Sequence, residues 1–306
     1  MTTVNLSVTA PIEFALTRVK RVLFQPFDIA KWFVIGFCAW LAYLGQGGGG
    51  GGGGFGGWPD GRVSGGPREV IQEARQYIVE NLYWLLPLVL TVAVVSLALW
   101  VLIVWLSSRG RFMFLHCVAL NRAEVQLPWR RWAAQANSLF WFRLVSTALL
   151  LVPIVPLIVF LVLGIIRMAE RGVGPTNLVL LLGCLLALVL LAVLSWVIVR
   201  FTVDFIVPIQ YLRGCACLAA WRELLPFLQQ NLGPFLLYLL FRILLALAIG
   251  AIVLIVILAT CCIAGCLLAI PYLGTVLMLP ILVFDRSYSA AFLAQLGADY
   301  NVFTEV

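Results

Sequence analysis

The stretch from Ile243 to Phe284 contains 42 consecutive residues without an acidic or basic side chain. A single helix of that length would be about 63 Å long, whereas the hydrocarbon core of a bilayer is about 30 Å thick. The stretch therefore predicts two membrane-crossing helices, at about Pro234–Ala259 and Leu267–Phe284, joined by a tight turn near Thr260–Cys266. Its apolar residues are continuous rather than alternating, which favours helices over a β-barrel.

The composition extends this interpretation to the whole chain. Its 306 residues are 63% hydrophobic and 11% charged, against about 25% charged in a soluble domain. Four further apolar runs predict spans at Trp32–Leu44, Leu82–Leu106, Leu139–Ile166 and Leu178–Val199. We therefore predict an all-α fold, a polytopic transmembrane helix bundle of about six spans that forms a single integral membrane domain over residues 1–306.

The positive charges predict how the spans are oriented. With six spans and the N-terminus inside, five of the 20 Lys and Arg residues fall outside and the other 15 inside. This asymmetry agrees with the positive-inside rule. We expect a protein of the cell (inner) membrane with both termini in the cytoplasm. The five outside residues are Arg62, Arg68, Arg75, Arg167 and Arg171.

An amphipathic pattern recurs before the first, third and fifth predicted spans. Apolar residues follow one helix face over 12–23, over 129–140 and, less completely, over 221–232, and basic residues flank each of these stripes. Such helices are expected to lie in the cytoplasmic membrane interface. Arg109 and Arg200 begin stretches that match at an offset of 91 residues, which predicts three repeat units, 10–108, 109–199 and 200–306.

The basic residues beside these stripes are candidates for contact with anionic lipid. Lysine and arginine near a membrane surface attract anionic headgroups. Membrane lipids are therefore the expected partners, and a protein partner or a homo-oligomer is left open. Nucleic acid is not expected, because no soluble basic module accompanies the net charge of +7. The candidate residues are Arg18, Lys20, Arg21, Arg130, Arg131 and Arg222.

The segment after the first predicted span is dominated by glycine. Residues 45–57 contain eleven glycines, which confer maximal backbone freedom and offer no side chains to pack. We interpret residues 45–67 as a flexible outer loop. A phosphate-cradling loop is not supported, because no Gly-Lys-Ser/Thr sequence follows.

Charged side chains near the inner ends of the spans form the strongest polar signal. Ionisable groups in spans are expensive and often functional, although long side chains can reach the interface. Two interpretations stay open, a ring of salt bridges, for example Asp204 with Arg200 or Arg242, and a functional polar cluster. The residues are Arg143, Arg200, Asp204, Arg242 and Asp285.

The sequence contains no recognisable catalytic or metal site. His116 is the only histidine, so a Ser-His-Asp arrangement lacks support and a histidine-rich zinc site is excluded. Cys261, Cys262 and Cys266 could form a disulfide or bind a soft metal, but small apolar packing residues are the simpler interpretation. We expect no enzyme activity, cofactor or metal, and the oxidation state of these cysteines stays open.

The layout resembles uncharacterised prokaryotic multi-pass families and the membrane domain attached to some glycerophosphodiester phosphodiesterases. The resemblance lies in the interfacial stripes, the glycine-rich loop, and the segments Asp204–Pro208 and Val283–Arg286. The catalytic domain of those enzymes is a separate soluble barrel that is absent here, so the resemblance does not imply their activity.

Two functional hypotheses remain. The first is a structural or accessory membrane protein associated with lipid. The alternative is a transporter or channel for a small or lipidic molecule, suggested by the repetition, the prolines in the spans and the charges around Asp204.

Overall fold

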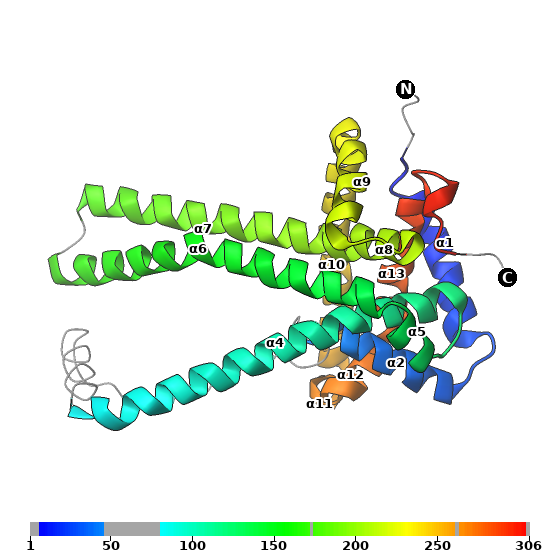
Figure 1. Cartoon of the computed structure of the whole chain (residues 1–306), viewed down its shortest axis with the longest axis horizontal. Helices are drawn as coiled ribbons and strands as arrows, with labels where there is room; N and C mark the ends of the chain where they lie inside the picture. The colour runs from blue at the N-terminus through cyan, green and yellow to red at the C-terminus, as the bar shows by residue number, and fades with distance from the viewer. Residues whose placement is uncertain (1–5, 46–79, 172–173, 261–262, 304–306) are drawn as a thin grey trace. The chain divides into compact units, whose positions relative to one another are not determined.

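The computed structural model describes residues 6–45, 80–171, 174–260 and 263–303, and in these residues every regular element is a helix (Figure 1). The prediction of an all-α fold is confirmed. The predicted glycine-rich loop, apart from Gly45, and both Cys261 and Cys262 lie outside the described residues. The elements are α1 (Ala10–Val19), η1 (Lys20–Phe24), α2 (Ile29–Tyr43), α4 (Leu82–Leu120), α5 (Gln126–Arg131), α6 (Ala133–Arg171), α7 (Pro175–Phe201), η2 (Thr202–Ile206), α8 (Val207–Arg213), α9 (Cys217–Gln230), α10 (Leu232–Ala259), α11 (Ile263–Ala269), α12 (Pro271–Leu277), α13 (Leu279–Ala294) and η3 (Ala298–Tyr300).

Four helical stretches in the described residues are long and apolar enough to cross a membrane: Tyr83–Leu120, Ala133–Met168, Asn177–Arg213 and Leu232–Ala259. A fifth candidate is the bent pair of α12 and α13. At the first predicted position α2 has only 15 residues, about 22 Å at 1.5 Å per residue. The structure thus provides four or five spans by length and composition, where about six were expected.

The last predicted span, Leu267–Phe284, is not one straight helix. The structure divides it among α11, α12 and α13, and α12 and α13 meet at an angle of 64°. Proline explains both breaks. Pro271 follows the extended Ile270, as expected because proline disfavours helical geometry in the residue before it. Pro280 stands in the first turn of α13, and because it has no N–H it cannot donate to the carbonyl of residue 276 and continue α12.

The predicted amphipathic stripes form α1, α5 and α9, with two corrections. The stripe over 129–140 is not one helix, because Trp132 leaves helical geometry and separates α5 from α6. Its ring instead stacks on that of Tyr211, with centroids 4.5 Å apart, so packing overrides the periodicity. The stripe of α1 packs against α13, and Ala15 is fully buried, so part of this face is covered by the chain itself.

The chain forms two compact units. The core unit comprises Met1–Gly53, Ile103–Phe142 and Arg200–Val306, and the arm unit comprises Gly54–Leu102 and Arg143–Val199. A helix of about 38 residues, such as Tyr83–Leu120, is about 57 Å long and exceeds the thickness of a bilayer core. The last turns of this helix, from residue 103 onwards, belong to the core unit.

The core unit buries three helical segments, each of which follows or ends a predicted span. Most residues of 110–119, 201–210 and 286–293 are buried. Gly110 leaves no room for a side chain, because a Cβ atom at this position would overlap the backbone of Leu41 and Ala42. Close contact between α2 and α4 therefore requires glycine here. The three buried segments fit the predicted repeat units, which stay a prediction.

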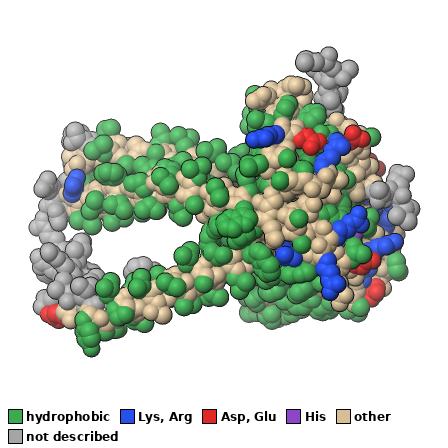
Figure 2. Space-filling view, in the orientation of Figure 1, with side chains coloured by type: hydrophobic (Ala, Val, Ile, Leu, Met, Phe, Trp, Pro, Cys, Tyr) green, Lys and Arg blue, Asp and Glu red, His purple; other side chains and the backbone are tan. Residues whose placement is uncertain are grey.

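In the arm unit the helices present apolar side chains to their surroundings. Almost none of the hydrophobic residues in its parts of α4, α6 and α7 is buried. In Figure 2 these helices are covered with hydrophobic and uncharged atoms, and most of the visible charge gathers over the core unit. Such a surface is stable in lipid and would aggregate in water.

Candidate functional site

Asp204 owes its position to a widened helical turn. Pro208 has no N–H to donate to the carbonyl of residue 204, and its ring would clash with that carbonyl in a regular α-helix. The chain responds with the π-helical segment η2, Thr202–Ile206, between α7 and α8. Such segments inside α-helices are often found at functional sites. Asp204 is 1% exposed, so its carboxylate must find partners within the protein.

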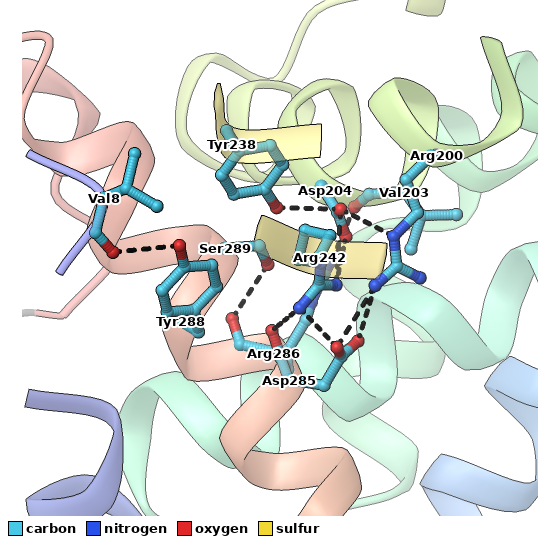
Figure 3. Close-up of polar contacts among 10 residues, drawn as sticks. All are labelled: Val8, Arg200, Val203, Asp204, Tyr238, Arg242, Asp285, Arg286, Tyr288 and Ser289. Atoms are coloured by element: carbon cyan, nitrogen blue, oxygen red, sulfur yellow. Dashed lines mark hydrogen bonds and ion pairs between the residues drawn. The ribbon is translucent and has the colours of Figure 1, made fainter. Parts of the chain in front are cut away.

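Four charged side chains form a closed ring (Figure 3). The carboxylate of Asp204 accepts from Nε of Arg200 at 3.0 Å and from Nη2 of Arg242 at 3.3 Å. Asp285 accepts from Nη2 of Arg200 at 3.1 Å and pairs with Nη1 of Arg242. The ring alternates in sign and carries no net charge. It ties together α7 with η2, α10 and α13.

Aromatic side chains enclose the ring. The hydroxyl of Tyr238 donates to Asp204 at 2.8 Å. The guanidinium of Arg242 lies 5.8 Å and 5.7 Å from the ring centroids of Tyr238 and Tyr288, within the range of cation–π attraction. Tyr288 in turn donates to the carbonyl of Val8 at 3.0 Å, which joins the N-terminal segment to the same site.

The arrangement is suited to holding helices in register. Moving a charge out of water costs several kcal/mol, and the attraction to an oppositely charged partner offsets this cost only when the two groups are close and well aligned. Each member of this ring has two oppositely charged partners, so the charges compensate one another as long as the three helices keep their places. The ring therefore specifies one packing of the helices more than it adds stability.

The structure brings together four of the five residues singled out for this cluster: Arg200, Asp204, Arg242 and Asp285. Arg143 belongs to the arm unit and is not a member of the ring. Sequence reasoning missed Tyr238, four residues before Arg242 on α10 and so on the same helix face. It also missed Arg286, a further charge directly after Asp285 in the same apolar segment.

The six residues expected to contact lipid lie on η1 and on three short helices of the core unit. Arg18 on α1 donates to the carbonyls of Val118 and Ala119 at the end of α4, and burial lowers the pKa of its guanidinium. The other five are exposed. They are Lys20 and Arg21 on η1, Arg130 and Arg131 on α5, and Arg222 on α9.

The only histidine lies in a polar contact of its own. His116 is 2% exposed; its Nδ1 lies 3.0 Å from the hydroxyl of Tyr211 and its Nε2 lies 3.7 Å from the carboxylate of Glu124. The thiol of Cys117, which is fully buried, donates to the backbone carbonyl of the same Glu124 at 3.5 Å. These contacts account for the histidine as a packing and hydrogen-bonding group.

The described cysteines are free thiols. Cys217 is buried at the start of α9, and desolvation raises the pKa of its thiol to about 12, so it is a poor nucleophile at neutral pH. Cys266 is exposed on α11. Among the residues described, no three His, Cys, Asp or Glu side chains are grouped to hold a metal ion.

A sequence profile that represents one family matches residues 6–303, which is nearly the whole chain. The chain belongs to DUF7544, a family of unknown function. Neither a curated protein nor a solved structure matches the chain. Membership of DUF7544 covers the core and arm units together, and it provides no support for the resemblance to the membrane domain of glycerophosphodiester phosphodiesterases.

Proposed function

We propose that this DUF7544 protein is a structural or accessory protein of the inner membrane that holds anionic lipid headgroups at the cytoplasmic side and catalyses no reaction. The observation that carries the proposal is the contrast between two surfaces. The long helices expose apolar side chains almost without interruption, whereas η1, α5 and α9 expose basic ones.

The basic residues are supported by the folded core rather than by loose loops. α1 is held by the contacts of Arg18 with the end of α4. α5 is held where Arg109 donates to the carbonyl of Trp129 at 3.2 Å. α9 packs against η2 and α8. The exposed charges are thus presented on rigid elements, which lowers the entropy cost of binding a headgroup.

The orientation rests on the charge asymmetry of the sequence. With the six predicted spans and the N-terminus in the cytoplasm, 15 of the 20 basic residues lie inside, as the positive-inside rule requires. The cytoplasmic leaflet is also the one that carries anionic lipid. Membrane lipids are then the principal partners, and we expect none of the contacts that nucleic acid would need.

Transport of a small or lipidic molecule is the second candidate. The bend of 64° between α12 and α13 favours it, because broken helices line the substrate sites of many transporters. The charge ring weighs against it, since its four members neutralise one another and leave no carboxylate for a coupling ion. A substrate-dependent flux in vesicles would establish transport in place of the structural role.

Lipid retention tests the proposal. We expect the purified protein to retain anionic lipid, and a variant with Arg130, Arg131 and Arg222 changed to Gln to bind it about 100-fold more weakly, because each charge contributes about 1 kcal/mol. The control changes Arg68, Arg75 and Arg167 to Gln, three arginines predicted outside. Native mass spectrometry with defined lipid measures both. Equal retention by both variants would refute the proposal.

A further inference from the structure

A groove in the core unit follows one flank of the continuous helix formed by α1 and η1. It has a volume of about 450 Å³, within the range of about 300–1,000 Å³ that is usual for ligand pockets. Glu13, Thr17 and Arg21 line it at a spacing of four residues, so they share one face of the helix. Asn301 and Phe303, from the segment after η3, also line it. The groove therefore lies between the first helix and the last described residues.

The walls of the groove are held by contacts within the core unit. The ring centroids of Phe14 and Phe303 are 4.8 Å apart, and the guanidinium of Arg18 lies 5.1 Å from the ring centroid of Phe303. Phe303 is 6% exposed, and its N–H donates to the side chain of Asn301 at 3.0 Å. Because these groups hold one another in place, a ligand would enter a preformed site at a low cost in entropy.

Positive charge gathers at one end of the groove and negative charge at the other. Burial and the nearby charge of Arg21 lower the pKa of Arg18, so the two guanidinium groups are close to each other. Glu13 stands five residues before Arg18, about 7.5 Å away along the helix axis. None of the three lining residues forms an ion pair within the described part of the chain. Paired arginines suit a phosphate group, and a carboxylate suits an ammonium group.

Exposed aromatic side chains follow directly after the arginine end. Phe24 and Phe27 are 49% and 60% exposed, and both pack against Trp32, with ring centroids 5.7 Å and 5.9 Å from that of the indole. The indole N–H of Trp32 donates to the carbonyl of Leu23 at 2.7 Å, which holds the aromatic cluster at the end of η1. Exposed aromatic groups beside basic residues are typical of a surface that lies in the membrane interface.

We propose that this groove binds the headgroup of an aminophospholipid, a lipid whose phosphate carries a primary ammonium group. The order of side chains along the helix matches the order of groups in such a lipid. The aromatic cluster contacts the acyl chains, Arg18 and Arg21 bind the phosphate, and Glu13 binds the ammonium group. A headgroup without an ammonium group would place its phosphate near the carboxylate of Glu13 with no cation between them. The inference rests on the membrane placement in the proposed function, but it uses none of the basic residues on α5 and α9.

Native mass spectrometry tests the proposal with two lipids of identical acyl chains, phosphatidylethanolamine and phosphatidylglycerol, of which only the first carries an ammonium group. Glu13→Gln should bind phosphatidylethanolamine about fivefold more weakly, because it loses one charged contact near the membrane surface, and phosphatidylglycerol no more weakly than the wild type. Arg21→Gln should weaken the binding of phosphatidylethanolamine by a similar factor. Both residues are exposed, so both variants should fold. The control is Lys20→Gln, next to Arg21 but outside the lining of the groove, which should retain phosphatidylethanolamine as the wild type does. Unchanged binding of phosphatidylethanolamine by Glu13→Gln, or an equal loss of both lipids, would overturn the proposal.

Two further measurements separate this site from the anionic-lipid sites and from a site for a soluble ligand. The variant with Arg130, Arg131 and Arg222 changed to Gln should bind phosphatidylethanolamine as the wild type does, whether or not it retains anionic lipid. Loss of phosphatidylethanolamine from this variant would contradict a site in the groove. Soluble O-phosphoethanolamine at the same concentration as the lipid should leave the bound lipid in place. Complete displacement would assign the groove to a soluble ligand and overturn the proposal.

Discussion

Replacing Asp204 with Asn removes one charge from the ring and leaves the shape of the side chain unchanged. Asp204 accepts from Arg200, Arg242 and Tyr238 at distances of 2.8 to 3.3 Å. In the variant, two arginines face the single carboxylate of Asp285, so the ring carries a net positive charge. The amide group of Asn also places an N–H donor next to the N–H and O–H donors of Arg200, Arg242 and Tyr238, which had an acceptor there before.

The magnitude follows from the burial. The side chains of Asp204 and Arg242 are 2% and 1% exposed, and breaking a buried ion pair by removing one partner costs about 3–5 kcal/mol. Three separate hydrogen bonds to a charged group would sum to about 4.5–9 kcal/mol, but such terms are not additive because the partners belong to one network. We therefore expect the free energy of unfolding to fall by about 4 kcal/mol.

Reversible unfolding in mixed micelles, followed by circular dichroism, measures this loss. The double variant Asp204→Asn with Arg242→Gln restores a neutral ring, so we expect it to lose less than the sum of the two single variants. The matched control is Asp299→Asn, whose exposed carboxylate pairs with Arg213 and whose removal should leave the midpoint unchanged. A loss below about 1 kcal/mol for Asp204→Asn, or strictly additive single variants, would refute the reasoning.

Three further predictions concern the same unfolding measurement. Tyr238→Phe removes the hydrogen bond to Asp204 and should cost about 2 kcal/mol; an unchanged midpoint would show that this bond contributes nothing. Gly110→Ala forces a Cβ into the backbone of α2 and should cost about 2 kcal/mol or more, whereas Gly183→Ala, with no atom nearby, should not destabilise. Asp28→Ala removes the side chain that accepts from Ala30 N–H at the start of α2 and should cost about 1 kcal/mol; a stabilising result would contradict the capping role.

The features that sequence reasoning recovered are those set by local composition. Long charge-free stretches can only be helices in lipid, so the all-α class and the positions of α4, α6, α7 and α10 followed directly. Arg200 and Asp204 stand four residues apart, which already places them on one helix face. Buried charges require partners, so a ring of salt bridges, for example of Asp204 with Arg200 or Arg242, was one of the two interpretations that the sequence left open.

The features that it missed depend on contacts between distant segments. Trp132 continues an amphipathic stripe in the sequence, yet it leaves the helix because Tyr211 offers a stacking partner. The burial of Arg286 could not be predicted from the sequence, because the neighbouring Asp285 suggests a local ion pair. In the structure Asp285 pairs instead with Arg200 and Arg242. Periodicity and charge counts contain no information on such pairings.

The most direct test of the membrane account is the side of the bilayer on which each end of α6 lies. Single cysteines are introduced at Arg131, just before α6, and at Arg167, near its far end, both of which are exposed, and a membrane-impermeant maleimide is applied to intact spheroplasts and to inverted vesicles. Labelling above that of the unsubstituted chain is measured. The account predicts that Arg167→Cys reacts in spheroplasts and Arg131→Cys only in inverted vesicles. Reaction of Arg131→Cys in spheroplasts, or of both variants on the same side, would contradict it.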